Sequence, residues 1–268
     1  MPLYDRWRHK PPPGARIDRS HNLANGLLGF WALNEAAGSI NVDSVNSTTL
    51  TQAGGANLLG CPGQVGPGLS TNGSNWRSQA SWPASLQAPW PLTFITAFSK
   101  IGNQASSGLV FGLWPSPLGI LFQSGTQTIT NFRNSGNAAI STLTTATGGT
   151  YVVAWEQASN TSGRWYINGN LDNTSATNIG AASYSTPNVA FGDSTSFANR
   201  TSGCVHHWGG IWSRVLSASE HAAIGSNVNA VWQMFAPQSQ YWLFNAAAAA
   251  AFKPAWAVES PVLGSGIV

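Results

Sequence analysis

The feature that most constrains the fold is the stretch 151–171, YVVAWEQASNTSGRWYINGNL. Two runs of β-branched and aromatic residues, Tyr151–Gln157 and Arg164–Ile167, flank turn-forming residues at Ser159–Gly163, which predicts a β-hairpin. Asn168-Gly169 follows directly, and this pair favours a type I′ turn because both residues readily adopt positive φ. We therefore expect Asn170–Thr174 to fold back along Arg164–Ile167 as the third strand of a meander.

The rest of the chain has the composition of a β-sandwich. Only 8% of its 268 residues are charged, and its 13 Trp and 11 Phe offer large apolar surfaces to bury. Short apolar runs recur between Gly, Pro, Asn and Ser clusters with almost no helical periodicity, which predicts one all-β, antiparallel sandwich or jelly roll. Besides the meander, the expected strands are Leu27–Leu33, Asn75–Ser81, Leu92–Phe98, Leu109–Leu113, Gly119–Gln123, Thr128–Arg133, Asn188–Phe191 and Cys204–Trp212.

The expected core is aromatic, because large rings lie within these strands and offer much apolar surface to bury. We expect burial of Trp31, Phe94, Trp155, Trp165, Phe191 and Trp212. The segment 48–73 is Gly-rich, and we expect turns at Cys61-Pro62-Gly63 and Gly66-Pro67-Gly68.

One helix start is clear in the sequence. Ser217 and Glu220 have the spacing of a capping box, in which each side chain bonds the backbone amide of the other residue. A short helix should follow, break near Gly225, and resume through Val228–Phe235 until Pro237 ends it.

Both ends of the chain differ from the middle. We expect a basic, Pro-rich arm at 1–26, the folded domain at 27–235, and an arm rich in aromatic residues and Ala at 236–268. The first 20 residues hold five cationic and two acidic side chains, so the remainder is neutral overall. The N-terminal arm is either a solvated tail or a tether, and the C-terminal arm should order only by docking. The predicted anchors of the arms are Trp7, Tyr241, Trp242, Phe244 and Trp256.

The acidic residues do not form a catalytic pattern. Jelly-roll glycosidases place carboxylates on alternate residues of one strand, and none of the nine acids here lies two positions from another. His206 and His207 are adjacent, so on a strand they should face opposite sides, one inward or into an interface and one to solvent, and should not chelate one metal. We predict no catalytic residue, no metal site and no cofactor.

Other function classes are limited by what the sequence lacks. No window reaches the roughly 20 apolar residues of a membrane span, and the first residues lack the apolar core of a secretion signal, so we expect no membrane contact. The neutral body offers no basic patch for nucleic acid. Spacing leaves open whether Cys61 and Cys204 form a disulfide.

Several short motifs fall in the order found in one known family. They are GFWALNE at 29–35, WYING at 165–169, VAFG at 189–192 and GIWSRVLS at 210–217 with Glu220. Together they resemble the concanavalin A-like laminin G family over about Leu27 to Phe235. The resemblance implies a jelly roll of two antiparallel sheets whose last strand runs into a short helix. Some members bind calcium at the sandwich rim through loop carboxylates, which would make Asp43, Asp172 or Asp193 the candidates here.

The segment Trp232–Pro237 and the tail also resemble chains encoded by bacteriophages and prophages, in which laminin G-like domains decorate virions. This resemblance implies a non-enzymatic structural protein of the virion, either a capsid decoration or cement protein or a tail component. We expect a homo-oligomer, a trimer by the phage analogy, whose arms join neighbouring subunits and other virion proteins such as the major capsid protein.

A second hypothesis is a lectin-like, glycan-binding module for attachment to a cell surface. Four tryptophans lie beside Pro, Ser and Gly in predicted loops, where they could stack on a sugar or pack an oligomer interface. These residues are Trp76, Trp82, Trp90 and Trp114.

Overall fold

The structure is a computed structural model of the whole chain. It describes residues 10–12, 14–35, 40–46, 49–54, 58–63, 66–71, 75–79, 91–102, 108–114, 118–122, 128–131, 139–159, 161–175, 188–192 and 203–236. The chain divides into two units, 1–235 and 236–268, and the description below concerns the first.

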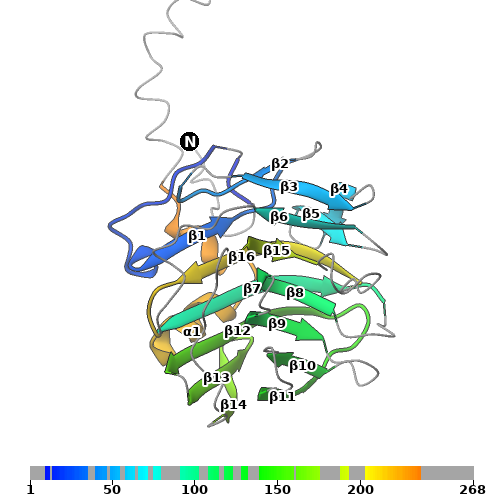
Figure 1. Ribbon diagram of the computed structural model, residues 1–268. Helices are drawn as coiled ribbons and strands as arrows, with labels where there is room; N and C mark the ends of the chain where they lie inside the picture. The colour runs from blue at the N-terminus through cyan, green and yellow to red at the C-terminus, as the bar shows by residue number, and fades with distance from the viewer. Residues whose placement is uncertain are drawn as a thin grey trace, which may run out of the picture. The chain divides into compact units, whose positions relative to one another are not determined.

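The described strands form two antiparallel sheets (Figure 1). The first sheet, in spatial order, contains β14 (Asn170–Ser175), β13 (Ser162–Ile167), β12 (Thr150–Ser159), β7 (Leu92–Lys100), β16 (Cys204–Trp212), β5 (Gly66–Thr71) and β4 (Leu58–Gly63), and β1 (Leu27–Trp31) also pairs with β16. The second contains β11 (Ala139–Thr144), β10 (Thr128–Asn131), β9 (Leu118–Phe122), β8 (Gly108–Trp114), β15 (Asn188–Phe191), β6 (Asn75–Gln79), β3 (Thr49–Gly54) and β2 (Ile40–Val42). The predicted all-β antiparallel sandwich is confirmed.

The predicted meander is present as β12, β13 and β14. Asn168 and Gly169 have φ values of 49° and 81°, as a type I′ turn requires, and Ile167 pairs with Asn170 across it. Asn168 also ties the turn to β12: its amide donates to the Val152 carbonyl at 2.8 Å, and its Oδ1 accepts from the Val152 amide at 2.9 Å. The Asn side chain therefore anchors the turn that its backbone makes.

The core between the sheets is aromatic, as expected. The rings of Phe111 and Phe191 from neighbouring strands of the second sheet lie 4.5 Å apart, and Trp31 of the first sheet meets both edge-on. All six aromatic residues that we expected to be buried are at most 1% exposed.

A second apolar cluster covers the outer face of the first sheet. Phe30 and Trp208 stack there at 5.8 Å, and Trp232 and Phe235 from the end of the domain pack on Phe30. Residues before β1 join this cluster, because Ile17 forms a β-bridge with Phe235 and Leu23 is buried.

The expectation that residues 1–26 lie outside the sandwich is therefore wrong for the part that the structure describes. The indole Nε1 of Trp212 donates to the Leu23 carbonyl at 2.7 Å, and Arg214 donates to the Asn25 carbonyl at 2.7 Å. Residues 22–24 form a 3₁₀ turn, η1 (Asn22–Ala24). The sequence concealed this docking because its partners lie almost 190 residues later.

The helix after β16 follows the prediction at its start only. In α1 (Ala218–Gly225), Ser217 and Glu220 form both bonds of the capping box. The predicted second helical segment, Val228–Phe235, is instead a shorter 3₁₀ helix, η4 (Ala230–Met234). Asn229, the N-cap residue of η4, makes no side-chain cap bond to the backbone, and its Oδ1 accepts from the Trp232 indole at 2.9 Å.

The Gly-rich segment 48–73 was predicted wrongly. The residues expected to form two turns belong instead to β4 and β5, where Pro62 pairs with Pro67 and Gly63 with Gly66. Proline is tolerated in β4 because this strand is at the edge of its sheet. Of the described helices, none is long and apolar enough to cross a membrane.

Candidate functional site

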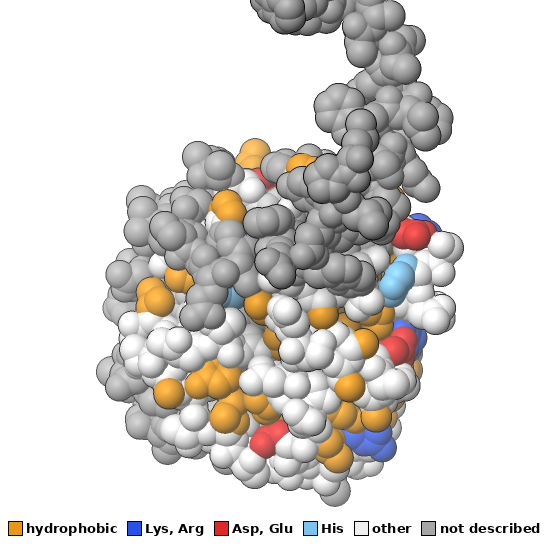
Figure 2. Space-filling view, turned by 180° about the vertical axis from the view of Figure 1, so that it is seen from behind, with side chains coloured by type: hydrophobic (Ala, Val, Ile, Leu, Met, Phe, Trp, Pro, Cys, Tyr) orange, Lys and Arg blue, Asp and Glu red, His pale blue; other side chains and the backbone are white. Residues whose placement is uncertain are grey.

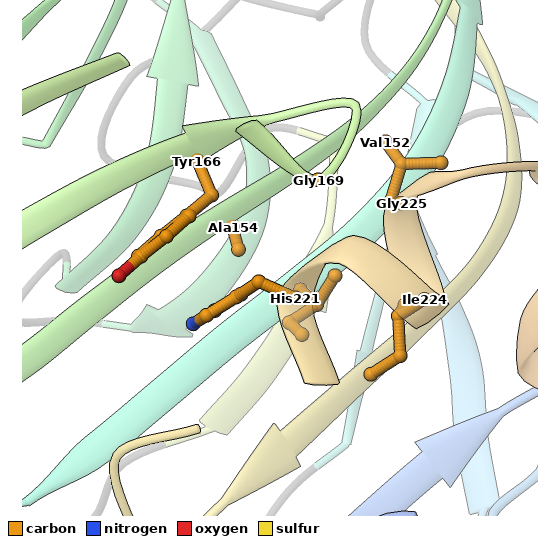
Figure 3. A pocket seen from close by; sticks show the side chains of 8 residues that line it. Val152, Ala154, Tyr166, Gly169, His221, Ile224 and Gly225 are labelled. Atoms are coloured by element: carbon orange, nitrogen blue, oxygen red, sulfur yellow. The ribbon is translucent and has the colours of Figure 1, made fainter. Parts of the chain in front are cut away.

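A buried polar cluster lies between α1 and the meander (Figure 3). His221 of α1 stacks on Tyr166 of β13, with ring centroids 3.7 Å apart and planes 8° from parallel. The Nε2 atom of His221 lies 3.0 Å from Oε2 of Glu156, which is on β12 and fully buried. Arg164, the cross-strand neighbour of Glu156, approaches Oε1 at 3.6 Å.

Two glycines let the helix approach close enough to form this cluster. A Cβ atom on Gly225 would lie 2.0 Å from the backbone nitrogen of Gly169, and one on Gly169 would lie 2.9 Å from the Cα of Ala222. The Asn-Gly turn thus has two roles. It reverses the chain, and because Gly169 has no side chain, the last turn of α1 can pack directly on its backbone. This seating holds His221 over Tyr166.

The cluster has acid–base groups but almost no room for a substrate. The cavity beside it measures about 10 Å³ and is lined mainly by apolar residues such as Ile95, Val152 and Ile224. A space of that size holds one water molecule at most. Glu156 and His221 therefore cannot act on a saccharide in this arrangement, and they fix α1 to the sheet.

The other described carboxylates are bound by groups of their own chain. Asp43 accepts from the amides of Phe30 at 2.9 Å and Val45 at 2.8 Å, and Glu220 accepts from Arg214 at 2.8 Å. The bond from Arg214, together with that from the Ser217 amide, lowers the pKa of Glu220 to about 2. Asp18 accepts from Ser20, and Asp172 accepts from Thr142. Glu35 accepts from Asn41 and Val42.

Two of the three calcium candidates, Asp43 and Asp172, already hydrogen-bond to backbone amides. Asp43 and Asp172 connect neighbouring segments of backbone, and Asp193 lies outside the described residues. Across the described ranges, no three His, Cys, Asp or Glu side chains lie close enough to hold a metal ion. The side chain of Cys61 is not described, so its pairing with buried Cys204 stays open.

The histidine pair on β16 was predicted only in part. His206 faces the core beside Phe191, but His207 does not reach solvent: both are 0% exposed, and Nε2 of His207 lies 2.8 Å from the Ser99 hydroxyl. The cause is a bulge, because the pairing with β7 skips from His206 to Trp208. Burial lowers the pKa of both histidines to about 3.

Of the four predicted sugar-stacking tryptophans, two lie in strands rather than loops. Trp76 is in β6, opposite Ala53 of β3, and Trp114 is in β8, opposite Asn188 of β15. Trp82 and Trp90 lie outside the described residues, as do the arm anchors Trp7, Tyr241, Trp242, Phe244 and Trp256. The roles of these residues stay predictions.

An open depression in the surface, formed by described residues, had no signal in the sequence. It lies where α1 meets η4, has a volume of about 290 Å³, and is lined by Ala223, Ser226, Asn227, Ala230 and Gln233. Small apolar residues alternate there with amide and hydroxyl groups. Charged side chains are sparse on the face of the molecule in Figure 2, in keeping with the low charge content of the chain.

The fold places the chain in one structural class, the antiparallel β-sandwiches. No family model and no curated protein sequence matches the chain. Among solved structures, it is similar to a Trypanosoma rangeli sialidase in complex with sialic acid, with 16% identity and a TM-score of 0.58, over 75% of this chain and 33% of that one. The chain thus spans about a third of the sialidase.

Two smaller proteins are similar over the same share of this chain, 75%. One is Domain 4 of AbnA, a GH43 extracellular arabinanase from Geobacillus stearothermophilus, in complex with arabinotriose, with 15% identity, a TM-score of 0.57 and 98% of that domain covered. The other is the binding domain of Paraclostridial Mosquitocidal Protein 1, with 11% identity, a TM-score of 0.59 and 52% covered. At these identities the likeness shows the fold, and the laminin G-like assignment stays a prediction.

Proposed function

We propose that this chain is a glycan-binding module without catalytic activity. The observation that carries the proposal is its likeness to nearly the whole of Domain 4 of the arabinanase, a domain whose structure holds arabinotriose. The likeness to the binding domain of the mosquitocidal protein adds a second binding domain with this fold. The described carboxylates also favour binding over catalysis, because each of them already hydrogen-bonds to another group of the protein.

The depression between α1 and η4 is our first candidate for the binding site. Its volume of about 290 Å³ is near the lower end for small-ligand sites, which suits a few sugar rings on an open surface. Asn227 and Gln233 each offer amide donors and acceptors to sugar hydroxyls, and Ala223 and Ala230 leave the floor flat. The alternative site uses Trp76, Trp82, Trp90 or Trp114.

A glycan array that includes arabino-oligosaccharides and sialosides tests the proposal, run with and without a chelator. We expect saturable binding, and calorimetry with the best ligand should then give a dissociation constant. Asn227→Ala with Gln233→Ala should weaken binding at least tenfold if the depression is the site, whereas single Trp→Phe changes should do so if the tryptophans are. Absence of saturable binding to any glycan would refute the proposal.

Lack of catalysis is a separate part of the proposal. The sialidase likeness covers only a third of that enzyme, so its activity does not transfer to this chain. Turnover of any bound glycan, lost when one acidic residue is replaced by its amide, would overturn this part while leaving glycan binding intact.

The virion role predicted from the two arms stays a prediction, as do the trimer and the contact with the major capsid protein. The similar structures described above are not virion proteins, and the tail lies outside the described residues. Deletion of 238–268 should leave the sandwich folded and weaken assembly. Unchanged assembly, or absence of the protein from purified virions, would contradict the virion role.

A further inference from the structure

The ammonium group of Lys10 lies in a cage of four backbone carbonyls. Its Nζ atom is 3.0 Å from the carbonyl oxygen of Ala32, 3.1 Å from that of Leu33 and 2.6 Å from that of His207, and it also donates to Pro67. These carbonyls come from the end of β1, from β5 and from β16, which are far apart in sequence. Among the described residues, the hydrogen-bond partners of this nitrogen are all carbonyls, and Glu35 acts on it by its charge.

The cage includes two backbone irregularities. Leu33 has a φ of 50°, a conformation that is unfavourable for a residue with a branched side chain. His207 occupies the bulge of β16, where it has no Cα partner on β7. The bulge and the left-handed residue therefore occur at two of the four carbonyls, those of His207 and Leu33, whereas Pro67 lies in the regularly paired part of β5.

Four acceptors exceed what an ammonium group can satisfy with three protons. Carbonyl oxygens that surround a point in this way replace the hydration shell of a cation, as in potassium-selective filters. The contacts to Ala32 and Leu33, at 3.0 and 3.1 Å, are longer than the 2.3–2.6 Å of calcium–oxygen bonds, and none of the four oxygens is anionic, whereas calcium sites usually include carboxylates. The cage therefore suits a large monovalent cation.

We propose that these four carbonyls are a binding site for a monovalent cation of ammonium or potassium size, and that Lys10 is its tethered occupant. The N-terminal segment then behaves as an internal ligand that a free cation can replace. This site is distinct from the proposed glycan site and does not depend on it.

Replacement of Lys10 by Met in the full chain tests the proposal, because the Met side chain ends at Cε, which keeps the apolar stem but removes the charged Nζ atom and leaves its place among the carbonyls free. Unfolding is followed in urea with chloride salts of potassium, ammonium or tetramethylammonium at constant ionic strength. For a dissociation constant of about 10 mM, 100 mM potassium or ammonium should raise the folding equilibrium constant of the variant about tenfold. Tetramethylammonium, which is too large for the cage, should not, and the wild type should not respond.

Lys100→Met is the matched control. Lys100 is also buried, but among the described residues its ammonium group bonds one carbonyl, that of Thr145 at 2.9 Å, and it lies over the Phe122 ring. Its variant should show no selective response to potassium or ammonium. A crystal of the Lys10→Met protein in rubidium chloride should show an anomalous peak among the four carbonyls.

Equal effects of the three salts on Lys10→Met, or equal responses of the wild type, would overturn the proposal. If Lys10→Met fails to fold in every salt, the proposal is also wrong, because a bound cation should substitute for the lysine. Folding that occurs only with potassium or ammonium supports it.

Discussion

Mild acid should destabilise this domain through His206 and His207. Both are fully buried and have pKa values near 3, against an ordinary value of 6.5, because burial disfavours the charged ring. Each histidine is neutral in the folded state, whereas the unfolded chain takes up a proton below pH 6.5. The two therefore contribute stability above pH 6.5 that is lost as the pH falls toward 3.

The size of the effect follows from these values. A pH of 5 is about 1.5 units below the ordinary histidine pKa, so the ring is protonated in the unfolded chain, while it is still neutral in the folded protein. At about 1.4 kcal/mol per unit, each histidine removes about 2 kcal/mol between pH 7 and pH 5, and the pair about 4 kcal/mol. Natural domains have free energies of unfolding of about 5–15 kcal/mol, so this loss is a large part of the total.

Urea unfolding at pH 7 and pH 5, followed by tryptophan fluorescence, measures this loss. The comparison protein carries His206→Leu, which keeps a large apolar group beside Phe191, and His207→Gln, whose amide can still bond Ser99. We expect the variant to lose much less stability than the wild type between the two pH values. A wild-type loss below about 1 kcal/mol, or equal losses in both proteins, would refute the reasoning.

Three further predictions concern α1 and its contact with the sheet. Glu156→Leu or His221→Leu should each cost about 3–5 kcal/mol in urea unfolding and the double change much less than their sum, because each single change leaves a buried polar partner; additive costs would contradict this. Glu220→Gln, made in the His206→Leu, His207→Gln variant so that the buried histidines do not unfold the domain in acid, should cost about 1–2 kcal/mol at pH 7, a difference that shrinks as the pH falls from 4.5 toward 2; an undiminished difference at pH 2.5 would show that the carboxylate charge is irrelevant. Gly225→Ala should cost about 1–3 kcal/mol in thermal unfolding, since its Cβ would meet the turn at 2.0 Å, whereas Gly102→Ala, with open space around it, should be neutral; equal effects would exclude the close packing of the helix.

Features with a local cause were predicted correctly from sequence. The Asn168-Gly169 turn, the Ser217 capping box and the burial of strand aromatics each follow from residues a few positions apart. Tight turns and helix caps are satisfied within one segment, so their signals survive without knowledge of the fold.

Features with distant partners were not predicted. Pro62 and Pro67 indicate turns in isolation, but β16 supplies a neighbour for β5, and the β4–β5 pair forms at the sheet edge. In the same way, the Pro-rich segment at Lys10 indicates a solvated arm until the carbonyls of β1 and β16 are placed around its ammonium group. The bulge that buries His207 has no signal in the sequence beyond the adjacent pair itself.

The candidate site could be predicted least, because binding surfaces combine short contributions from separate elements. Asn227 and Gln233 are ordinary polar residues at a helix end, and only the angle between α1 and η4 makes them line one depression. The tryptophans attracted attention by composition, yet Trp76 and Trp114 lie in hydrogen-bonded strands.

The distribution of carboxylates sharpens the contrast between binding and catalysis. Glu156 is buried against His221, beside a cavity too small for sugar, and the other described acids bond backbone or arginine groups. A mechanism based on free carboxylates would therefore have to draw on Asp5, Asp193 and Glu259, the acids outside the described residues. Replacing all three by amides should leave glycan binding unchanged if the module only binds. Loss of a measurable hydrolysis in that variant would instead place catalysis among these three residues.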